Sequence, residues 1–226
     1  MLNELVRPPT IRETLVDTLQ SAILKGELKQ GHPLREEELS NSLKVARGTL
    51  REAFQILQKE GLVEIFPHRG AFVTTLSLRK IEEIYSFRQL VEPYAVGLAM
   101  ERNAYGEQDL EELEALLRRM AEYEQRDDGF RLKKTDVDFH YQICKPSDHQ
   151  LLLGMLKNIQ SLTLLCVMNF QYYDPNPTLQ EPLHREILNL ILSGDCVHTQ
   201  NRIREHLGAA KSELLAGLEA ATVSSQ

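Results

Sequence analysis

Apolar residues recur every three to four positions in the first quarter of the chain, a spacing typical of amphipathic helices. The first set lies within residues 10–25 and ends at a Lys-Gly stop signal: Ile11, Leu15, Leu19, Ile23 and Leu24. A loop with Gly31 and Pro33 follows, and REEELSNSL predicts a short second helix with an acidic first turn. The pattern therefore predicts two helices separated by a loop.

A third amphipathic helix is predicted after the turn at residues 44–46. Its inward positions are apolar: Leu50, Ala53, Phe54 and Leu57. A second face has a basic and polar character: Arg47, Arg51, Gln55 and Gln58. Gly61 ends the helix, and the β-like runs LVEIF and AFVTT flank a turn at residues 67–70. These two runs predict a hairpin.

From Ser77 onward the pattern is helical almost throughout. Five breaks interrupt it, near residues 102–106, 127–129, 146–149, 173–177 and 194–195. The breaks predict six helices, so the protein is expected to be mainly α. A chain of 226 residues suits two domains, because domains usually have ~100–150 residues. We expect one domain at residues 1–76 and an all-helical one at residues 77–226.

The net charge of −7 at first argues against a nucleic-acid partner. Its distribution changes this view, because residues 1–75 hold 10 basic and 10 acidic residues, whereas residues 76–226 hold 16 and 23. The acidic excess thus lies entirely in the predicted helical domain. A local basic face on the first domain is compatible with this balance.

Two further features bear on the protein's compartment. No apolar run approaches the ~20 residues of a membrane-spanning helix, and the start MLNELVRPPT lacks the apolar core of a signal peptide. We therefore expect a cytoplasmic protein without a membrane partner. The cysteines match neither a disulfide framework nor a paired-cysteine zinc site, and we expect three buried, unreactive thiols: Cys144, Cys166 and Cys196.

The order of helix, short helix, turn, basic helix and hairpin is that of a winged helix-turn-helix, which inserts the tip of its basic helix into the major groove. That tip carries Arg47, Thr49 and Arg51. Arginine pairs with guanine or phosphate, and threonine contacts phosphate or a thymine methyl group. In the hairpin, Gly70 permits a close turn, and His68 and Arg69 can reach phosphate. The alternative for the arginines is a merely solvated face.

The segment LREEELSNSLKVARGTLREAFQILQKEGLVEIFPHRGAFV resembles the DNA-binding domain of GntR-type bacterial regulators, and the resemblance covers about residues 10–76. It implies operator contacts from six residues: Arg47, Thr49, Arg51, His68, Arg69 and Gly70. Ala46 and Gly48 stand where this family usually has Ser or Thr. A helix N-cap oxygen and a phosphate contact are therefore missing, each worth ~1 kcal/mol.

Four residues of the helical domain have metal-ligating side chains at matching positions. Asp136 and His140 are four residues apart and project from one face of a helix at residues 130–145. His184 and His206 lie at similar distances before and after the turn at residues 194–195, so a helix hairpin places both at the same depth. One carboxylate and three imidazoles can thus meet. An Asp–His pair alone is more often a surface hydrogen bond.

The segments EEIYSFRQLVEP, DVDFH and HREILNLILSGD resemble the FCD ligand-binding domain of GntR regulators, over about residues 79–222. The same four residues match the ligand positions of that family one by one. Their donor atoms suit Zn, Ni, Mn or Fe(II), with zinc as the first expectation. An open coordination position can accept the carboxylate of a small organic acid. Arg88 can supply a second clamp for this effector, or it can pair with Glu92 one helical turn away.

These resemblances imply a ligand-responsive transcriptional regulator, which we expect to be a repressor. Operators consist of repeated half-sites, so we expect a homodimer on a pseudo-palindromic double-stranded operator. The alternative is a metal-dependent hydrolase or oxygenase with an accessory basic domain, because a His₃-Asp site also suits such enzymes. The sequence has no glycine-rich phosphate loop or HExxH motif, which favours the regulator.

Overall fold

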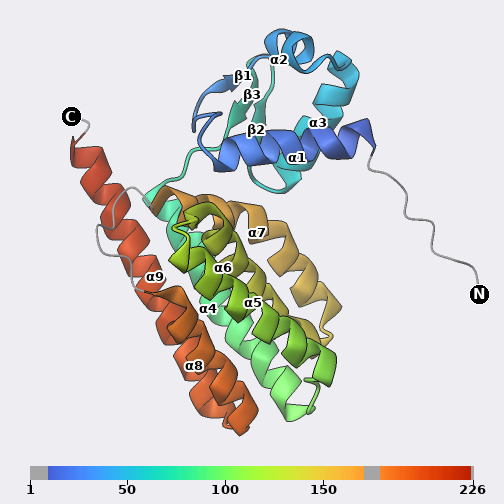
Figure 1. The fold of residues 1–226 in the computed structure, drawn as a ribbon. Coiled ribbons are helices and arrows are strands. Elements are labelled where there is room, and N and C mark those ends of the chain that lie inside the picture. Colours follow the sequence, from blue (N-terminus) through green and yellow to red (C-terminus); the bar gives the residue numbers. More distant parts are fainter. Residues whose placement is uncertain (1–9, 171–178, 225–226) are drawn as a thin grey trace, which may run out of the picture. The chain divides into compact units, whose positions relative to one another are not determined.

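A computed structural model describes residues 10–170 and 179–224. The chain forms two compact units, residues 1–75 and 76–226 (Figure 1). The first combines helices with a small sheet, and the second is helical. The predicted break at residues 173–177 lies outside the described residues.

The first unit has the element order predicted for a winged helix-turn-helix. Its elements are α1 (Ile11–Leu24), β1 (Pro33–Leu34), α2 (Glu36–Leu43), α3 (Arg47–Lys59), β2 (Val63–Phe66) and β3 (Gly70–Val73). A capping box starts α1, because the Thr10 side chain accepts from the Glu13 amide and Glu13 accepts from the Thr10 amide. The core lies between α1, α3 and the sheet and is apolar: Leu19, Leu50, Phe54, Leu57 and Leu62.

The sheet contains a strand that the sequence pattern did not predict. The strand order is β1-β3-β2, with antiparallel pairing throughout. Leu34 of β1 pairs with Ala71, and the Gly31 amide donates to the Val73 carbonyl beside it. A strand of two residues is too short for any alternation of apolar and polar positions to show. The loop predicted at Gly31 and Pro33 is therefore partly a sheet edge.

In its described residues the second unit has six α-helices, as the sequence predicted. They are α4 (Leu78–Glu101), α5 (Glu107–Gln125), α6 (Gly129–Cys144), α7 (Gln150–Phe170), α8 (Gln180–Ser193) and α9 (Cys196–Ser224). A short 3₁₀ turn at Lys145–Ser147 joins α6 to the α7 segment. The most buried side chains come from several helices: Leu113, Leu117, Phe139, Ile143 and Leu165. The mainly α fold class is thus confirmed.

Helices α4 and α9 lie side by side along their lengths (Figure 1). Gly97 permits this close approach, because a Cβ atom there would lie 2.0 Å from the Gln200 side-chain nitrogen. That nitrogen donates to the Pro93 carbonyl, and the Gln89 side chain donates to the Arg204 carbonyl. These contacts fix α9 against α4, and both helices carry residues of the site described below.

Two predictions on composition need correction. The stretch Gln150–Met168 of α7 has a mean hydropathy of 1.6 over an 18-residue window and is long enough to span a membrane, contrary to our expectation. Half of that window is buried inside the helical unit, as befits the core helix of a bundle. The prediction of three buried thiols holds for Cys144 and Cys166 but is wrong for Cys196. Cys196 is partly exposed because it opens α9 directly after the turn at Gly194.

Candidate metal centre and nucleic-acid interface

Helix α3 presents its arginines to solvent at its N-terminal end. Arg47 pairs with Glu37 of α2 at 2.9 Å, and Arg51 pairs with Glu36 at 2.8 Å. More than half of each arginine side chain remains exposed. Such exposed pairs contribute little to stability, so either guanidinium can exchange its carboxylate partner for a phosphate at low cost. Ala46 occupies the N-cap without a side-chain hydrogen bond, as its sequence position implied.

The turn between β2 and β3 forms an ordered, exposed tip. His68 adopts a left-handed backbone (φ 61°), and Gly70 does so as well (φ 89°). The Arg69 guanidinium lies over the rings of Phe66 and Phe72, at 5.4 and 5.7 Å from their centres. These cation–π contacts orient the Arg69 side chain before any partner binds. No sequence motif indicates that Phe66 and Phe72 support Arg69 in this way.

The structure brings the four predicted metal-ligating residues together inside the helical unit. Asp136 and His140 come from α6, His184 from α8 and His206 from α9. Their potential ligand atoms all lie within 4.8 Å of one another, and each residue is at most 8% exposed. His140 Nε2 is 3.2 Å from His206 Nε2, and His184 Nε2 is 2.9 Å from Asp136 Oδ1. The predicted helix hairpin therefore places His184 and His206 at the same depth.

One buried nitrogen of this cluster has no hydrogen-bond partner in the part of the chain that the structure describes, which is consistent with a binding site for a cation. His184 Nε2 is completely buried and has no hydrogen-bond partner among the described residues. Its contact with Asp136 is short but lacks hydrogen-bond geometry. An unpaired buried nitrogen is costly. A divalent ion shared between these two side chains would satisfy it.

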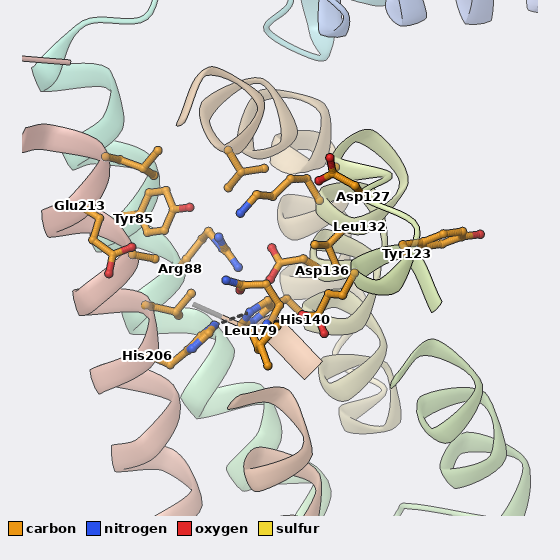
Figure 2. A pocket seen from close by; sticks show the side chains of 18 residues that line it. Tyr85, Arg88, Tyr123, Asp127, Leu132, Asp136, His140, Leu179, His206 and Glu213 are labelled. Atoms are coloured by element: carbon orange, nitrogen blue, oxygen red, sulfur yellow. Dashed lines mark hydrogen bonds between the residues drawn. The ribbon is translucent and has the colours of Figure 1, made fainter. Parts of the chain in front are cut away.

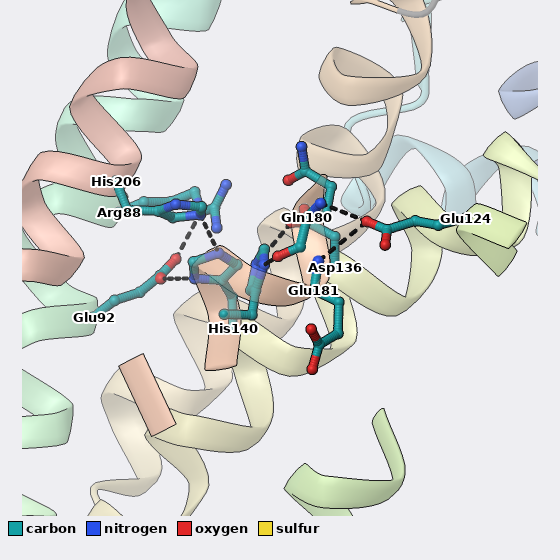
Figure 3. Close-up of polar contacts among 9 residues, drawn as sticks. Arg88, Glu92, Glu124, Asp136, His140, Gln180, Glu181 and His206 are labelled. Carbon is teal, nitrogen blue, oxygen red and sulfur yellow. Dashed lines mark hydrogen bonds and ion pairs between the residues drawn. The ribbon is translucent and has the colours of Figure 1, made fainter. Parts of the chain in front are cut away.

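Hydrogen bonds on the outer side of the rings fix two of the tautomers. His140 Nδ1 donates to Glu92 Oε2 at 2.8 Å (Figure 3). His184 Nδ1 donates to the Gln180 carbonyl at 2.7 Å. Each ring therefore keeps the lone pair of Nε2 for the centre of the cluster. This is the arrangement in which proteins hold metal-ligating histidines.

The electrostatics of the cluster favour the forms that bind metals. Burial lowers the pKa of His140 below its usual value in spite of Glu92, and burial with two neighbouring imidazoles lowers that of His206 further. Although burial raises the pKa of Asp136, His184 holds it well below its usual range. Near neutral pH His140 and His206 are therefore neutral and Asp136 is a carboxylate, which are the ligating species of these groups.

Arg88 takes part in the buried network beside this cluster. Its Nε donates to Glu92 Oε1 at 2.6 Å, so Glu92 joins Arg88 to His140. The intrahelical pair that the sequence allowed is thus present. Glu92 raises the pKa of Arg88 against the opposing effect of burial, and Arg88 stays cationic. Sequence spacing marks Glu92 only as a partner of Arg88, because the contact of Glu92 with His140 spans 48 positions.

A cavity of about 450 Å³ adjoins the cluster (Figure 2). Asp136, His140 and His206 line it together with Arg88. Pockets of ~300–1,000 Å³ are typical for small-molecule ligands. Residues from six helices line this cavity, including several outside the quoted sequence motifs: Tyr123, Lys133 and Glu213. Arg88 thus faces both Glu92 and the cavity.

A winged helix-turn-helix followed by an all-helical domain is an arrangement found in bacterial transcriptional regulators. Family models identify the two parts: "Bacterial regulatory proteins, gntR family" matches residues 11–73, and "FCD domain" matches residues 83–209. The chain belongs to the GntR family of transcriptional regulators and carries an FCD domain.

Curated relatives agree with this assignment. The chain is 27% identical over 203 residues to the HTH-type transcriptional repressor RspR of Escherichia coli (strain K12), covering 87% of this chain and 86% of that protein. It is 26% identical over 202 residues to a "Probable D-xylose utilization operon transcriptional repressor" of Paenarthrobacter nicotinovorans, covering 88% and 87%. The named function of these relatives favours the regulator over a metalloenzyme.

Solved structures share the fold. A GntR regulator from Rhodococcus sp. RHA1 has a TM-score of 0.77 and 22% identity, covering 91% of this chain and 97% of that chain. E. coli McbR/YncC has a TM-score of 0.72 and 21% identity, covering 95% and 100%. At this level of identity the likeness establishes the architecture alone.

Proposed function

We propose that this GntR regulator is a cytoplasmic repressor whose operator affinity depends on a small organic acid bound beside a divalent metal. Zinc is the first choice, with nickel, manganese or iron as alternatives. The ligands are Asp136, His140, His184 and His206. The observation that carries the proposal is the buried, unpartnered His184 Nε2 within 4.8 Å of three further donor atoms, next to a cavity.

The protein's own residues account for the binding of an acid in that cavity. When bound, the ion supplies a Lewis-acidic centre with an open coordination position for a carboxylate. Arg88 supplies a permanent cation, which Glu92 holds in one orientation by a bond of 2.6 Å. The ring of Tyr85, whose centre lies 5.0 Å from the guanidinium carbon, supports the same side chain. A preorganised cation of this kind loses little entropy on binding an anion.

In this proposal residues 1–76 form the DNA-binding domain and residues 77–226 the metal- and effector-binding domain. The operator-contacting residues are Arg47, Thr49, Arg51, His68, Arg69 and Gly70. The proposal is supported by their positions at the tip of α3 and at the β2–β3 turn, where Thr49 is partly exposed and the other five are exposed. A single small DNA-binding domain has limited affinity for DNA. The proposed DNA-binding form is therefore a homodimer on a pseudo-palindromic operator.

Metal content tests the proposal first. Protein purified without chelators is expected to contain about one divalent ion per chain by elemental analysis. His206→Ala removes one ligand and is expected to lower the retained metal strongly. His198→Ala is the matched control, because His198 lies on the same helix but is exposed, with 63% of its side chain accessible. Wild-type protein that takes up no ion even from added zinc would reject the metal centre.

A further inference from the structure

The charges that line the cavity beside the metal cluster are unevenly distributed. We infer that the effector is a small acid whose far end donates hydrogen bonds, through hydroxyl or ammonium groups, and does not carry a second carboxylate. This inference rests on the proposed function, because it assumes that the acid's first carboxylate binds at the metal and Arg88.

The inner end of the cavity provides for one carboxylate. Arg88, Asp136 and His140 line it there, and each is at most 8% exposed. Arg88 is the cation of this inner end, and Glu92 already shares its charge. The metal and Arg88 together therefore match a single carboxylate. A second anionic group has to lie farther out in the cavity.

The outer part of the cavity is predominantly acidic. Three carboxylates line it, from Glu124 of α5, Asp127 after α5, and Glu213 of α9. Asp127 and Glu213 are exposed, which places them at the mouth, and Figure 2 shows them on opposite sides of the cavity. Glu124 accepts hydrogen bonds from the backbone amides of Gln180 and Glu181 at the start of α8.

Lys133 is the one cation besides Arg88 among the described residues that line the cavity. It lies one helical turn before Asp136, and its charge helps to lower the pKa of that carboxyl. Three carboxylates against one ammonium leave the outer part net negative. A second carboxylate on the ligand would therefore meet like charges, whereas hydroxyl or ammonium groups would find acceptors.

Matched pairs of acids test this inference on the zinc-loaded full chain. Gluconate and glucarate differ at the far end by a hydroxymethyl group against a carboxylate, and 5-aminovalerate and glutarate differ by an ammoniomethyl group against a carboxylate. Calorimetry and thermal shift are expected to show tighter binding of gluconate and 5-aminovalerate, by about fivefold or more, because exposed like charges repel moderately. Diacids that bind equally well or better would overturn the inference.

Variants locate the source of the preference. Asp127→Asn combined with Glu213→Gln is expected to remove most of the discrimination against the diacids. Asparagine also suits the left-handed backbone at Asp127 (φ 53°). Glu219→Gln is the control, because Glu219 is an exposed carboxylate of α9 that does not line the cavity.

The outcomes separate this inference from the proposed function. If the metal-loaded protein binds none of the four acids, the acid site itself is rejected. If it binds the diacids preferentially, the site stands and the far-end chemistry is wrong. If the double variant discriminates as the wild type does, the mouth carboxylates do not select the ligand and the inference fails.

Discussion

At the scale of single residues, Glu92 links Arg88, which lines the cavity, to His140 of the metal cluster. Its oxygens accept from Arg88 and from His140, and the residue is 2% exposed. Although burial raises the pKa of Glu92, Arg88 and His140 together hold it below the usual value. As a carboxylate, Glu92 therefore accepts both hydrogen bonds and sets the tautomer of His140.

Glu92→Gln is expected to weaken zinc binding by about 10–100-fold, as for other residues that orient metal ligands. Glutamine must either present its amide N–H groups to His140 Nδ1, which favours the wrong tautomer, or present them to the donor Arg88. Zinc affinity measured by competition with a chelator tests this expectation. Unchanged affinity would show that His140 needs no carboxylate partner.

Two controls separate this positioning role from general destabilisation. Glu83→Gln breaks a similar Arg–Glu pair on α4, at 2.8 Å but exposed, and is expected to leave zinc affinity unchanged. Nitrogen-15 shifts of His140 in the metal-free protein report the tautomer directly. They are expected to show a protonated Nδ1 in the wild type and a shift toward protonated Nε2 in Glu92→Gln.

The clustering of the four proposed metal ligands could be predicted from the sequence, because helical spacing fixes Asp136 against His140 and the turn at Gly194 fixes His184 against His206. Glu92 could not be placed in the same way, because its contact with His140 depends on how α4 packs against α6. Lys133 and Glu213 likewise meet at the cavity only through the packing of separate helices. The periodicity of apolar residues predicts which face of a helix points inward, but it does not predict which residues of another helix that face contacts.

At the scale of elements, α3 and the β2–β3 hairpin were predictable because their residues are close in sequence and their turn signals are strong. The two-residue strand β1 was not, because its pairing with β3 joins Leu34 to Ala71 across 37 positions. The sequence also did not reveal that Arg47 and Arg51 pair with the acidic first turn of α2. Those pairs require the two helices to be folded against each other.

Arg51→Ala is expected to weaken operator binding and to reduce by about one the slope of log affinity against log salt concentration, because one phosphate contact is lost. Fluorescence anisotropy with a DNA fragment selected from a random pool measures both quantities. Arg126→Ala is the control, since Arg126 is an exposed arginine of the helical unit that also pairs with a glutamate. Equal slopes for Arg51→Ala and wild type would show that Arg51 makes no phosphate contact with the operator.

At the scale of the whole molecule, the buried histidines make stability depend on pH. In the metal-free protein the pKa values of His140 and His206 lie below the ordinary 6.5, whereas the unfolded chain titrates at its ordinary value. Below that value the unfolded chain binds more protons than the folded one, so stability must fall as the pH decreases.

Urea unfolding of the metal-free protein is therefore expected to give a nearly constant free energy above about pH 7 and a decline between about pH 6.5 and 5. His206→Ala is expected to flatten part of that decline, and His198→Ala is expected to leave it unchanged because His198 is exposed. A free energy of unfolding that rises on acidification over this range would contradict the described burial of the imidazoles.

Operator affinity measured with and without a binding acid tests most directly whether the proposed metal centre is coupled to DNA binding. For the zinc-loaded wild type, the acid is expected to change operator affinity by about 5–150-fold, the usual range of allosteric coupling. The double variant His184→Ala/His206→Ala is expected to bind the operator without responding to the acid, whereas His198→Ala responds as the wild type does. A full response of the double variant would contradict the account.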